Sequence, residues 1–174
     1  MQPTAFTLRA RFILTITICL LLGPAVSAWP GNEYDPYERD ILKGIPVIQV
    51  MVDPLEPDAE RDGLTNTQLK TDVEVRLRKA GIRVASSGLF PVLRLIVKEL
   101  KRSASEKCVY ALRLELLQEI ALVRNRSVSF NAATWEYSYL GEVGADKFSR
   151  TVRDNVADMV DHFINAYLEY NPKP

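Results

Sequence analysis

The sequence predicts an α+β fold, a two-layer sandwich in which two helices cover one face of a mostly antiparallel sheet of four or five strands. Two observations lead to this prediction. Residues 91–139 contain three consecutive segments in which apolar and polar side chains alternate. On either side of them, residues 64–81 and 147–170 carry apolar side chains at three- and four-residue steps. The expected order is strand, helix, four strands, helix.

The first 28 residues are predicted to be a cleavable signal peptide. Arg9 and Arg11 precede an apolar run at Phe12–Leu22, and Val26-Ser27-Ala28 supplies the small residues that a signal peptidase requires. The run is shorter than the ~20 residues of a membrane span, so no transmembrane span is expected once the signal is removed. We therefore expect export to the periplasm or secretion. An uncleaved anchor stays open as the alternative.

The rest of the chain is predicted to be a flexible lead-in, residues 29–44, and a single domain, residues 45–172. The chain has 22 Lys and Arg and 22 Asp and Glu residues, and this near-neutral charge argues against nucleic acid as the main partner. Cys108 is the single cysteine outside the predicted signal, so no internal disulfide is expected. An incidental or partly buried thiol is favoured over a reactive or bridging one.

The first strand is predicted at Val47–Val52, whose nearly continuous apolar run is typical of an interior strand. An acidic loop follows at residues 53–63. Its carboxylates at Asp58, Glu60 and Asp62 resemble the opening of a calcium loop, but the twelfth position is Leu69, where that loop needs a bidentate Glu. A solvated loop is favoured, and a cation site at these three residues is kept as the alternative.

The helix at Leu64–Gly81 has clear end signals. Thr65 is the expected N-cap, Gln68 completes a capping box, and Gly81 ends the helix in the left-handed conformation. A short strand is expected at Ile82–Val84, and the order strand, helix, strand predicts parallel pairing. The last helix is expected from Lys147 to Tyr170.

Alternation predicts three further strands joined by hairpins, at Val92–Leu100, Val109–Val123 and Val128–Tyr139. If the apolar residues are to share one face, Leu95 must pair with Leu114 and Ile120 with Phe130. This register leaves a three-residue turn at residues 124–126.

The same register places a row of charged and aromatic side chains on the face of the sheet away from the helices. We predict this row to be the binding surface: Arg94, Ile96, Arg113, Glu115, Trp135, Tyr137 and Tyr139. Arg94 would form a cross-strand ion pair with Glu115. The register also points Thr134 at the core. A bulge at Ala132-Ala133 would reverse the parity and bury Trp135 and Tyr137 instead, and both arrangements stay open.

No motif in the sequence predicts catalysis. His162 is the single histidine, no Ser lies in a G-x-S-x-G turn, and no Gly-rich phosphate loop occurs. We therefore expect no enzyme and no cofactor; a hydrolase-type activity is the weaker alternative. The expected function is that of an exported, non-catalytic domain that binds or assists another envelope component or protein. The alternative is a periplasmic protein that binds a small ligand or a cation through residues 53–63.

The chain resembles a loose group of bacterial exported proteins of unknown function. The segments that carry this resemblance are Gly63-Leu64-Thr65, Asp72-Val73-Glu74, residues 77–82, Ala133-Thr134-Trp135 and residues 161–165. They cover most of the chain after the predicted signal, and the group implies no catalytic residues. The expected order of elements is also similar, in fold alone, to small periplasmic accessory domains of outer-membrane transport and assembly systems.

Overall fold

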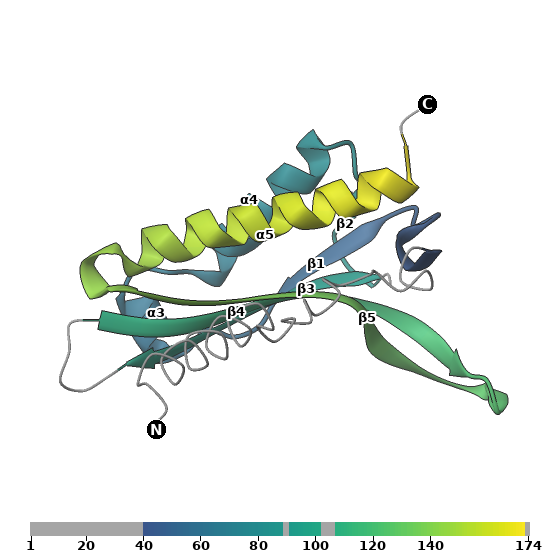
Figure 1. Cartoon of the computed structure of the whole chain (residues 1–174), viewed down its shortest axis with the longest axis horizontal. Helices are drawn as coiled ribbons and strands as arrows, with labels where there is room; N and C mark the ends of the chain where they lie inside the picture. The colour runs from purple at the N-terminus through teal and green to yellow at the C-terminus, as the bar shows by residue number, and fades with distance from the viewer. Residues whose placement is uncertain (1–39, 89–90, 102–106, 173–174) are drawn as a thin grey trace, which may run out of the picture. The chain divides into compact units, whose positions relative to one another are not determined.

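The computed structural model describes residues 40–88, 91–101 and 107–172 (Figure 1). The predicted signal peptide and most of the predicted lead-in lie outside these residues. The elements in chain order are η1 Asp40–Leu42, β1 Ile48–Val52, α3 Pro57–Arg61, α4 Asn66–Lys79, β2 Val84–Ala85, β3 Val92–Lys101, β4 Lys107–Leu122, β5 Asn125–Gly144, η2 Ala145–Lys147 and α5 Phe148–Tyr170.

The five strands form one mixed sheet in the order β2-β1-β3-β4-β5. Strand β1 pairs in parallel with β2 and with β3, while β3, β4 and β5 pair antiparallel. Helices α4 and α5 lie side by side on one face of this sheet (Figure 1). The predicted α+β class and the two helices are confirmed, as is the parallel pairing across α4. The neighbouring position of β1 and β3 was not predicted.

The core lies between this face of the sheet and the two helices. Successive side chains of a strand point to opposite faces of the sheet, so every second residue enters the core. In β1, Ile48 and Val50 are buried, whereas Met51 is exposed. The apolar stripes of both helices face the sheet, as their spacing predicts. The largest fully buried side chains are Tyr110, Phe148, Phe163, Leu42, Ile48, Leu64, Leu69, Leu77, Leu93, Leu95, Leu112 and Leu114.

Helix α4 begins and ends as its sequence predicts. The Thr65 hydroxyl oxygen accepts a hydrogen bond from the Gln68 N–H at 3.2 Å, so Thr65 is the N-cap. At the other end Gly81 has a φ of 83°, and the Ile82 N–H donates to the Leu77 carbonyl at 2.9 Å. This Schellman arrangement needs a residue that tolerates positive φ, which explains the glycine.

Two segments predicted as irregular are ordered. Within the acidic loop, Pro57–Arg61 forms the short helix α3, because Ala59 is buried there against the core. The end of the predicted lead-in, residues 40–44, also belongs to the domain. Leu42 is 2% exposed, and the Asn171 side chain at the end of α5 donates to the Leu42 carbonyl and accepts from the Gly44 N–H, both at 2.7 Å.

The predicted register between β3 and β4 is confirmed: Leu95 lies opposite Leu114 and Arg94 opposite Glu115. Between β4 and β5 the predicted pair of Ile120 and Phe130 is also present. That register then breaks at a bulge.

At the bulge, Leu117 lies opposite Ala133 but Leu116 lies opposite Trp135, so Thr134 is the extra residue on β5. The Thr134 hydroxyl donates a hydrogen bond to the Leu116 carbonyl at 3.2 Å, at the point where the register between β4 and β5 shifts. The bulge lies one residue beyond the position considered for it, and it reverses the parity of the following residues.

The hairpin turn and the end of β5 differ from the prediction. The turn is Val123-Arg124, flanked by the pair of Leu122 and Asn125, instead of residues 124–126. Because Ala121 pairs with Ser129 and Leu122 with Asn125, residues 126–128 are extra on β5. The Asn125 side chain accepts a hydrogen bond from the Ser127 N–H at 3.2 Å, which forms a local turn in this extra segment. Strand β5 continues to Gly144, and Gly141 is required there because a Cβ would lie 2.5 Å from the Tyr110 ring.

Within the described residues, no helix combines the length and the apolar character that crossing a membrane demands.

Replacing the N-cap tests the helix boundary. Thr65→Ala should lower the free energy of unfolding by about 1 kcal/mol, because the Gln68 N–H loses its acceptor. Thr67→Ala is the matched control, since the Thr67 side chain is exposed. Its backbone carbonyl accepts a hydrogen bond from the Thr71 hydroxyl, and the substitution leaves this carbonyl in place. Urea denaturation of both variants measures the difference. Equal stabilities of the two variants would contradict the assigned cap.

Candidate functional site

The structure divides the predicted binding row between the two faces of the sheet. Arg94, Ile96, Arg113 and Glu115 alternate along β3 and β4 with buried residues such as Leu95 and Leu114, and so lie on the face away from the helices, here called the open face. Trp135, Tyr137 and Tyr139 lie opposite Leu116, Leu114 and Leu112, whose side chains enter the core. The prediction of one continuous row is therefore wrong. The physical reason is the bulge at Thr134, which inverts the parity of β5.

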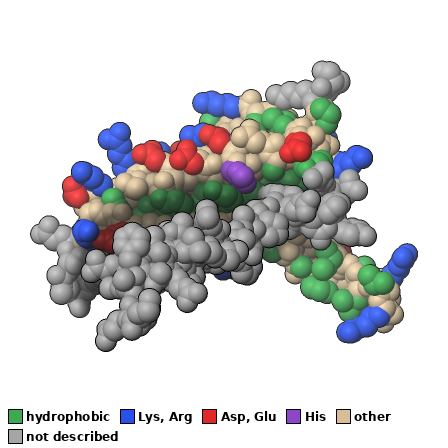
Figure 2. Space-filling view, in the orientation of Figure 1, with side chains coloured by type: hydrophobic (Ala, Val, Ile, Leu, Met, Phe, Trp, Pro, Cys, Tyr) green, Lys and Arg blue, Asp and Glu red, His purple; other side chains and the backbone are tan. Residues whose placement is uncertain are grey.

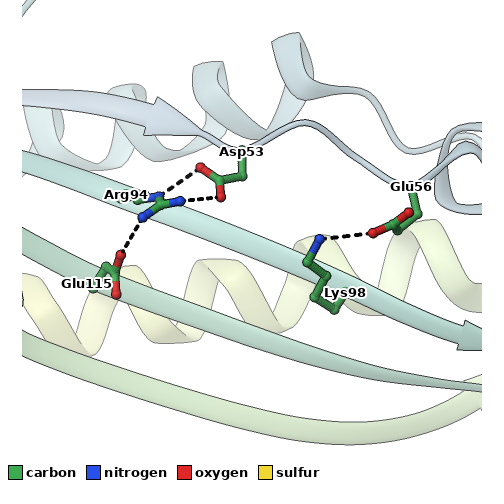
Figure 3. Close-up of polar contacts among 5 residues, drawn as sticks. All are labelled: Asp53, Glu56, Arg94, Lys98 and Glu115. Carbon is green, nitrogen blue, oxygen red and sulfur yellow. Dashed lines mark hydrogen bonds and ion pairs between the residues drawn. The ribbon is translucent and has the colours of Figure 1, made fainter.

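On the open face Arg94 contacts two carboxylates, that of Asp53 directly after β1 and that of Glu115 on β4 (Figure 3). Its Nε and Nη2 atoms donate to the two carboxylate oxygens of Asp53 at 2.8 and 2.7 Å. Its Nη1 donates to Oε1 of Glu115 at 3.2 Å, the ion pair that the sequence predicts. The two parallel hydrogen bonds between Arg94 and Asp53 make this pair bidentate, and bidentate pairs are among the stronger charge-assisted contacts in proteins.

The sequence analysis missed Asp53 as a partner of Arg94. Asp53 has the same parity as Met51, which lies opposite Arg94 in the parallel pair of β1 and β3. Once that pairing is known, Asp53 is expected on the open face beside Arg94. These hydrogen bonds from Arg94 lower the pKa of Asp53 below its ordinary value of 3.8, against a smaller opposing effect of burial.

Further ion pairs occur on this side of the sheet. Lys98 contacts Glu56 at 2.9 Å, as Figure 3 shows, and Arg113 contacts Glu136 of β5 at 3.5 Å. The side chains of both pairs are about half exposed. The three charged residues predicted on the open face, Arg94, Arg113 and Glu115, therefore form ion pairs within the domain, and structural pairing accounts for their charges.

The aromatic residues of β5 pack against α5. The Trp135 ring lies edge-on to Phe163 with centroids 5.0 Å apart, and the Tyr137 ring lies 4.4 Å from the His162 ring. Trp135 is half-buried, whereas Tyr137 is 37% exposed. His162 is exposed on the polar flank of α5, as its position in the sequence predicts. These four rings close one side of the core.

Beyond the bulge the β4–β5 hairpin continues past the helix layer (Figure 1). We call residues 117–133 the hairpin arm. None of them is buried, although β4 up to Leu116 supplies some of the most buried side chains of the domain. Ile120 pairs with Phe130 on the face that continues the helix-covered side of the sheet.

The arm carries an apolar face, made of Ile120, Leu122, Val128 and Phe130. Val128 is 44% and Phe130 47% exposed, and Val123 at the turn is 94% exposed. The opposite face carries polar side chains such as Glu119, whose carboxylate accepts from the Ser129 hydroxyl. Figure 2 shows hydrophobic side chains along this projecting hairpin and basic side chains at its tip.

The distribution of exposed apolar residues singles out this part of the molecule. Among the described residues, eight large hydrophobic side chains are exposed, and six of them lie in the β4–β5 turn or in β5: Val123, Val128, Phe130, Tyr137, Tyr139 and Leu140. The alternation in the sequence of β4 predicts which of its side chains form the apolar face. It does not predict at which residue the helices stop covering that face. Three of these six side chains, Val123, Val128 and Phe130, lie in the arm, which is therefore the candidate functional site that sequence analysis missed.

A polar joint fixes the base of the arm. Gln118, the residue that interrupts the apolar parity of β4, donates through its side-chain amide to the Ile41 carbonyl at 3.1 Å and to the Thr134 hydroxyl oxygen at 2.8 Å. This amide therefore connects η1, β4 and the bulge of β5. Gln118 marks the point at which the buried part of the hairpin ends.

The three predicted cation ligands do not form a group in the structure. Asp58 forms an ion pair with Arg61, and Glu60 is exposed on α3. Asp62 lies instead near Glu99 and the buried Cys108, and one ligand atom from each of these three lies within 4.8 Å of the others. The burial of Cys108 agrees with the interpretation of this thiol as a buried, incidental one.

The Asp53–Arg94 pair predicts a pH dependence of stability. Because the folded-state pKa of Asp53 is lowered, its stabilising contribution is complete above the unfolded value of 3.8 and is lost as the pH falls through the folded value. Asp53→Asn should therefore be less stable than the wild type by on the order of 1 kcal/mol at about pH 7, with the difference shrinking as the pH falls below 3.8.

Chemical denaturation at several pH values measures this difference. Glu56→Gln is the matched control, because the Glu56–Lys98 pair is more exposed, with side chains 46% and 55% accessible. We expect a smaller effect from it. A difference between Asp53→Asn and the wild type that stays constant down to low pH would contradict the assigned pair.

No protein-family model and no curated protein matches the chain. Several solved structures are similar to it in fold, two of them as follows. A dodecamer of a PelC variant from Paraburkholderia phytofirmans is 18% identical, with a TM-score of 0.40, over 66% of this chain and 83% of that chain. A minor lipoprotein from Acinetobacter baumannii is 12% identical, with a TM-score of 0.37, over 74% and 97%. At these values the similarity carries no conclusion about function.

Proposed function

We propose that this chain is an exported, non-catalytic binding module that engages a protein of the cell envelope through the apolar face of the hairpin arm. The proposal depends on one observation. Ile120, Leu122, Val128 and Phe130 continue the apolar parity of the sheet into a region that the helices leave uncovered. Burial of an apolar face of this kind by a partner is favourable, because it removes the apolar surface from water.

The chemistry around this face favours a protein as the occupant. Phe130 supplies an aromatic anchor, and Arg124 and Arg126 lie exposed at the tip. Aromatic residues and arginine are enriched at protein interfaces, and a polar rim around an apolar centre is their usual composition. None of the described residues of the arm is buried, so a partner can cover its apolar face.

The non-catalytic part of the proposal follows from how the polar residues are used. Arg94, Asp53 and Glu115 satisfy one another, and His162 lies against Tyr137. Mutual pairing of this kind stabilises a scaffold, and the charges are then less available for a substrate. The export part of the proposal rests on the predicted signal peptide at residues 1–28.

Site-specific photocrosslinking tests the arm as a docking surface. A photoreactive phenylalanine analogue at position 130 in the cell should give a discrete adduct with a second, different protein. The same analogue at position 75 is the matched control, because Val75 is 39% exposed on α4, away from the arm. Ile120→Ser should reduce the adduct at position 130 by about tenfold, because it removes the residue paired with Phe130.

Three outcomes would contradict the proposed function. The first is an equal yield of adducts at positions 130 and 75. The second is an adduct at position 130 that contains only two copies of this chain. The third is binding to vesicles of anionic lipid that depends on Phe130 in a flotation assay, since this would assign the arm to a lipid surface.

The alternative function, cation binding by the acidic loop, has less support from the geometry. Asp58 is paired with Arg61, and a carboxylate bound to a guanidinium is a poor calcium ligand. Calorimetric titration of the purified chain with calcium should therefore give no saturable heat. Saturable binding that is lost in both Asp58→Asn and Asp62→Asn would restore the cation-binding alternative.

A further inference from the structure

The tip of the hairpin arm carries two positive charges that have no counter-charge within the described residues. Arg124 lies in the turn, Arg126 follows two residues later, and both are exposed. Basic side chains stand at this end of the hairpin in Figure 2. The ion pairs of the described residues, such as Arg153 with Asp72 at 2.8 Å, include neither of them. These two charges therefore take no part in holding the domain together.

The arm is apolar on one face only. Its apolar face continues the helix-covered side of the sheet through the pair of Ile120 and Phe130. On the opposite face the Glu119 carboxylate accepts a hydrogen bond from the Ser129 hydroxyl. Immersion of the whole arm in lipid hydrocarbon would bury this carboxylate, which is costly. The arm is therefore suited to contact with a partner on one side.

A single helix has the width of this apolar face. Neighbouring strands lie about 4.8 Å apart, so the two strands of the arm form a strip about 10 Å wide, which is the diameter of one α-helix. Nearer the centre of the sheet the same two strands are already covered by one helix, since α5 contacts both β4 and β5.

Helix α5 stops near the base of the arm. It ends at Tyr170, and the following Asn171 donates a hydrogen bond to the Leu42 carbonyl of η1. The same segment accepts the hydrogen bond from Gln118 at the base of the arm. A helix from a partner would therefore continue the helix layer over the part of the sheet that α5 leaves uncovered.

A second copy of this chain offers no such helix within its described residues. A helix must present an apolar stripe to cover the arm. The stripe of α4, which includes Leu69 and Leu77, and that of α5, which includes Val156 and Phe163, are buried against their own sheet. The helix that fits the arm therefore belongs to a different protein, in agreement with the proposed function.

We propose that the partner presents an acidic amphipathic helix to the arm. Its apolar side covers the face formed by Ile120, Leu122, Val128 and Phe130, and its carboxylates pair with Arg124 and Arg126 at the tip. Carboxylates are the complementary groups, because a partner that covers the tip without them leaves two guanidinium groups beside the interface with no counter-charge. This inference rests on the proposed function and names the chemistry of the partner.

Charge reversal at the tip tests the acidic character of the partner. In the full chain in the cell, with the photoreactive analogue at position 130, Arg124→Glu combined with Arg126→Glu should lower the yield of the heterologous adduct by about tenfold, because like charges then face each other. Lys79→Glu combined with Lys147→Glu is the matched control. It makes the same change of net charge at exposed positions on α4 and η2, and should leave the yield unchanged.

A charge-keeping variant separates charge from a loss of folding. Arg124→Lys combined with Arg126→Lys should keep the yield within about twofold of the wild type, since both positive charges remain. A loss in this variant as large as in the charge reversal would overturn the inference, and so would an equal loss in the Lys79 and Lys147 control. An adduct that the charge reversal leaves unchanged would also overturn it.

The site of the crosslink in the partner tests the helix. Mass spectrometry of the digested adduct should identify a segment whose apolar residues recur at three- and four-residue steps, with Asp or Glu within about two turns of the crosslinked residue. A segment in which apolar residues alternate would indicate a strand and would overturn the inference. A segment without acidic residues would overturn it as well.

The inference and the proposed function fail in different ways. A heterologous adduct that is insensitive to charge reversal, or that maps to a segment of the wrong kind, overturns the acidic helix and leaves the proposed function standing. Absence of a heterologous adduct at position 130 overturns the proposed function, and the inference with it. Flotation with anionic lipid vesicles that charge reversal abolishes would assign the tip to a lipid surface and contradict both.

Discussion

The structure depends on where the buried face of β4 ends. As far as Leu116 this face is covered by the helices, and at Gln118 the chain places an amide instead of another aliphatic side chain. An amide at the margin of a core needs partners, and Gln118 finds them in the Ile41 carbonyl and the Thr134 hydroxyl. The Thr134 hydroxyl in turn occupies the carbonyl of Leu116. This set of hydrogen bonds holds the bulge, and the bulge decides which face every later residue of β5 occupies.

Much of the architecture follows from local rules that the sequence displays. The cap at Thr65, the left-handed Gly81 and the register between β3 and β4 were predictable because each depends on neighbouring residues or on uninterrupted parity. The register of β5 was harder. A bulge held by a threonine hydroxyl has no glycine to mark it, and a single extra residue moves Trp135 and Tyr137 from one face to the other.

The candidate sites show the same division. The ion pair of Arg94 with Glu115 was predictable from parity within one hairpin. Asp53 was not predicted as its second partner, because that contact requires β1 and β3 to be neighbours, which is a property of the whole topology. The exposure of the arm is likewise a tertiary property. The residues of its apolar face look like core residues in the sequence, and only the extent of the helix layer shows that they are not.

The contact between Gln118 and the Ile41 carbonyl connects the base of the arm to η1. Asn171 connects the same segment to the end of α5 through hydrogen bonds with Leu42 and Gly44. The base of the arm, η1 and the last turn of α5 are therefore linked by side-chain hydrogen bonds at the margin of the core, and a substitution at Gln118 removes the link between the arm and η1.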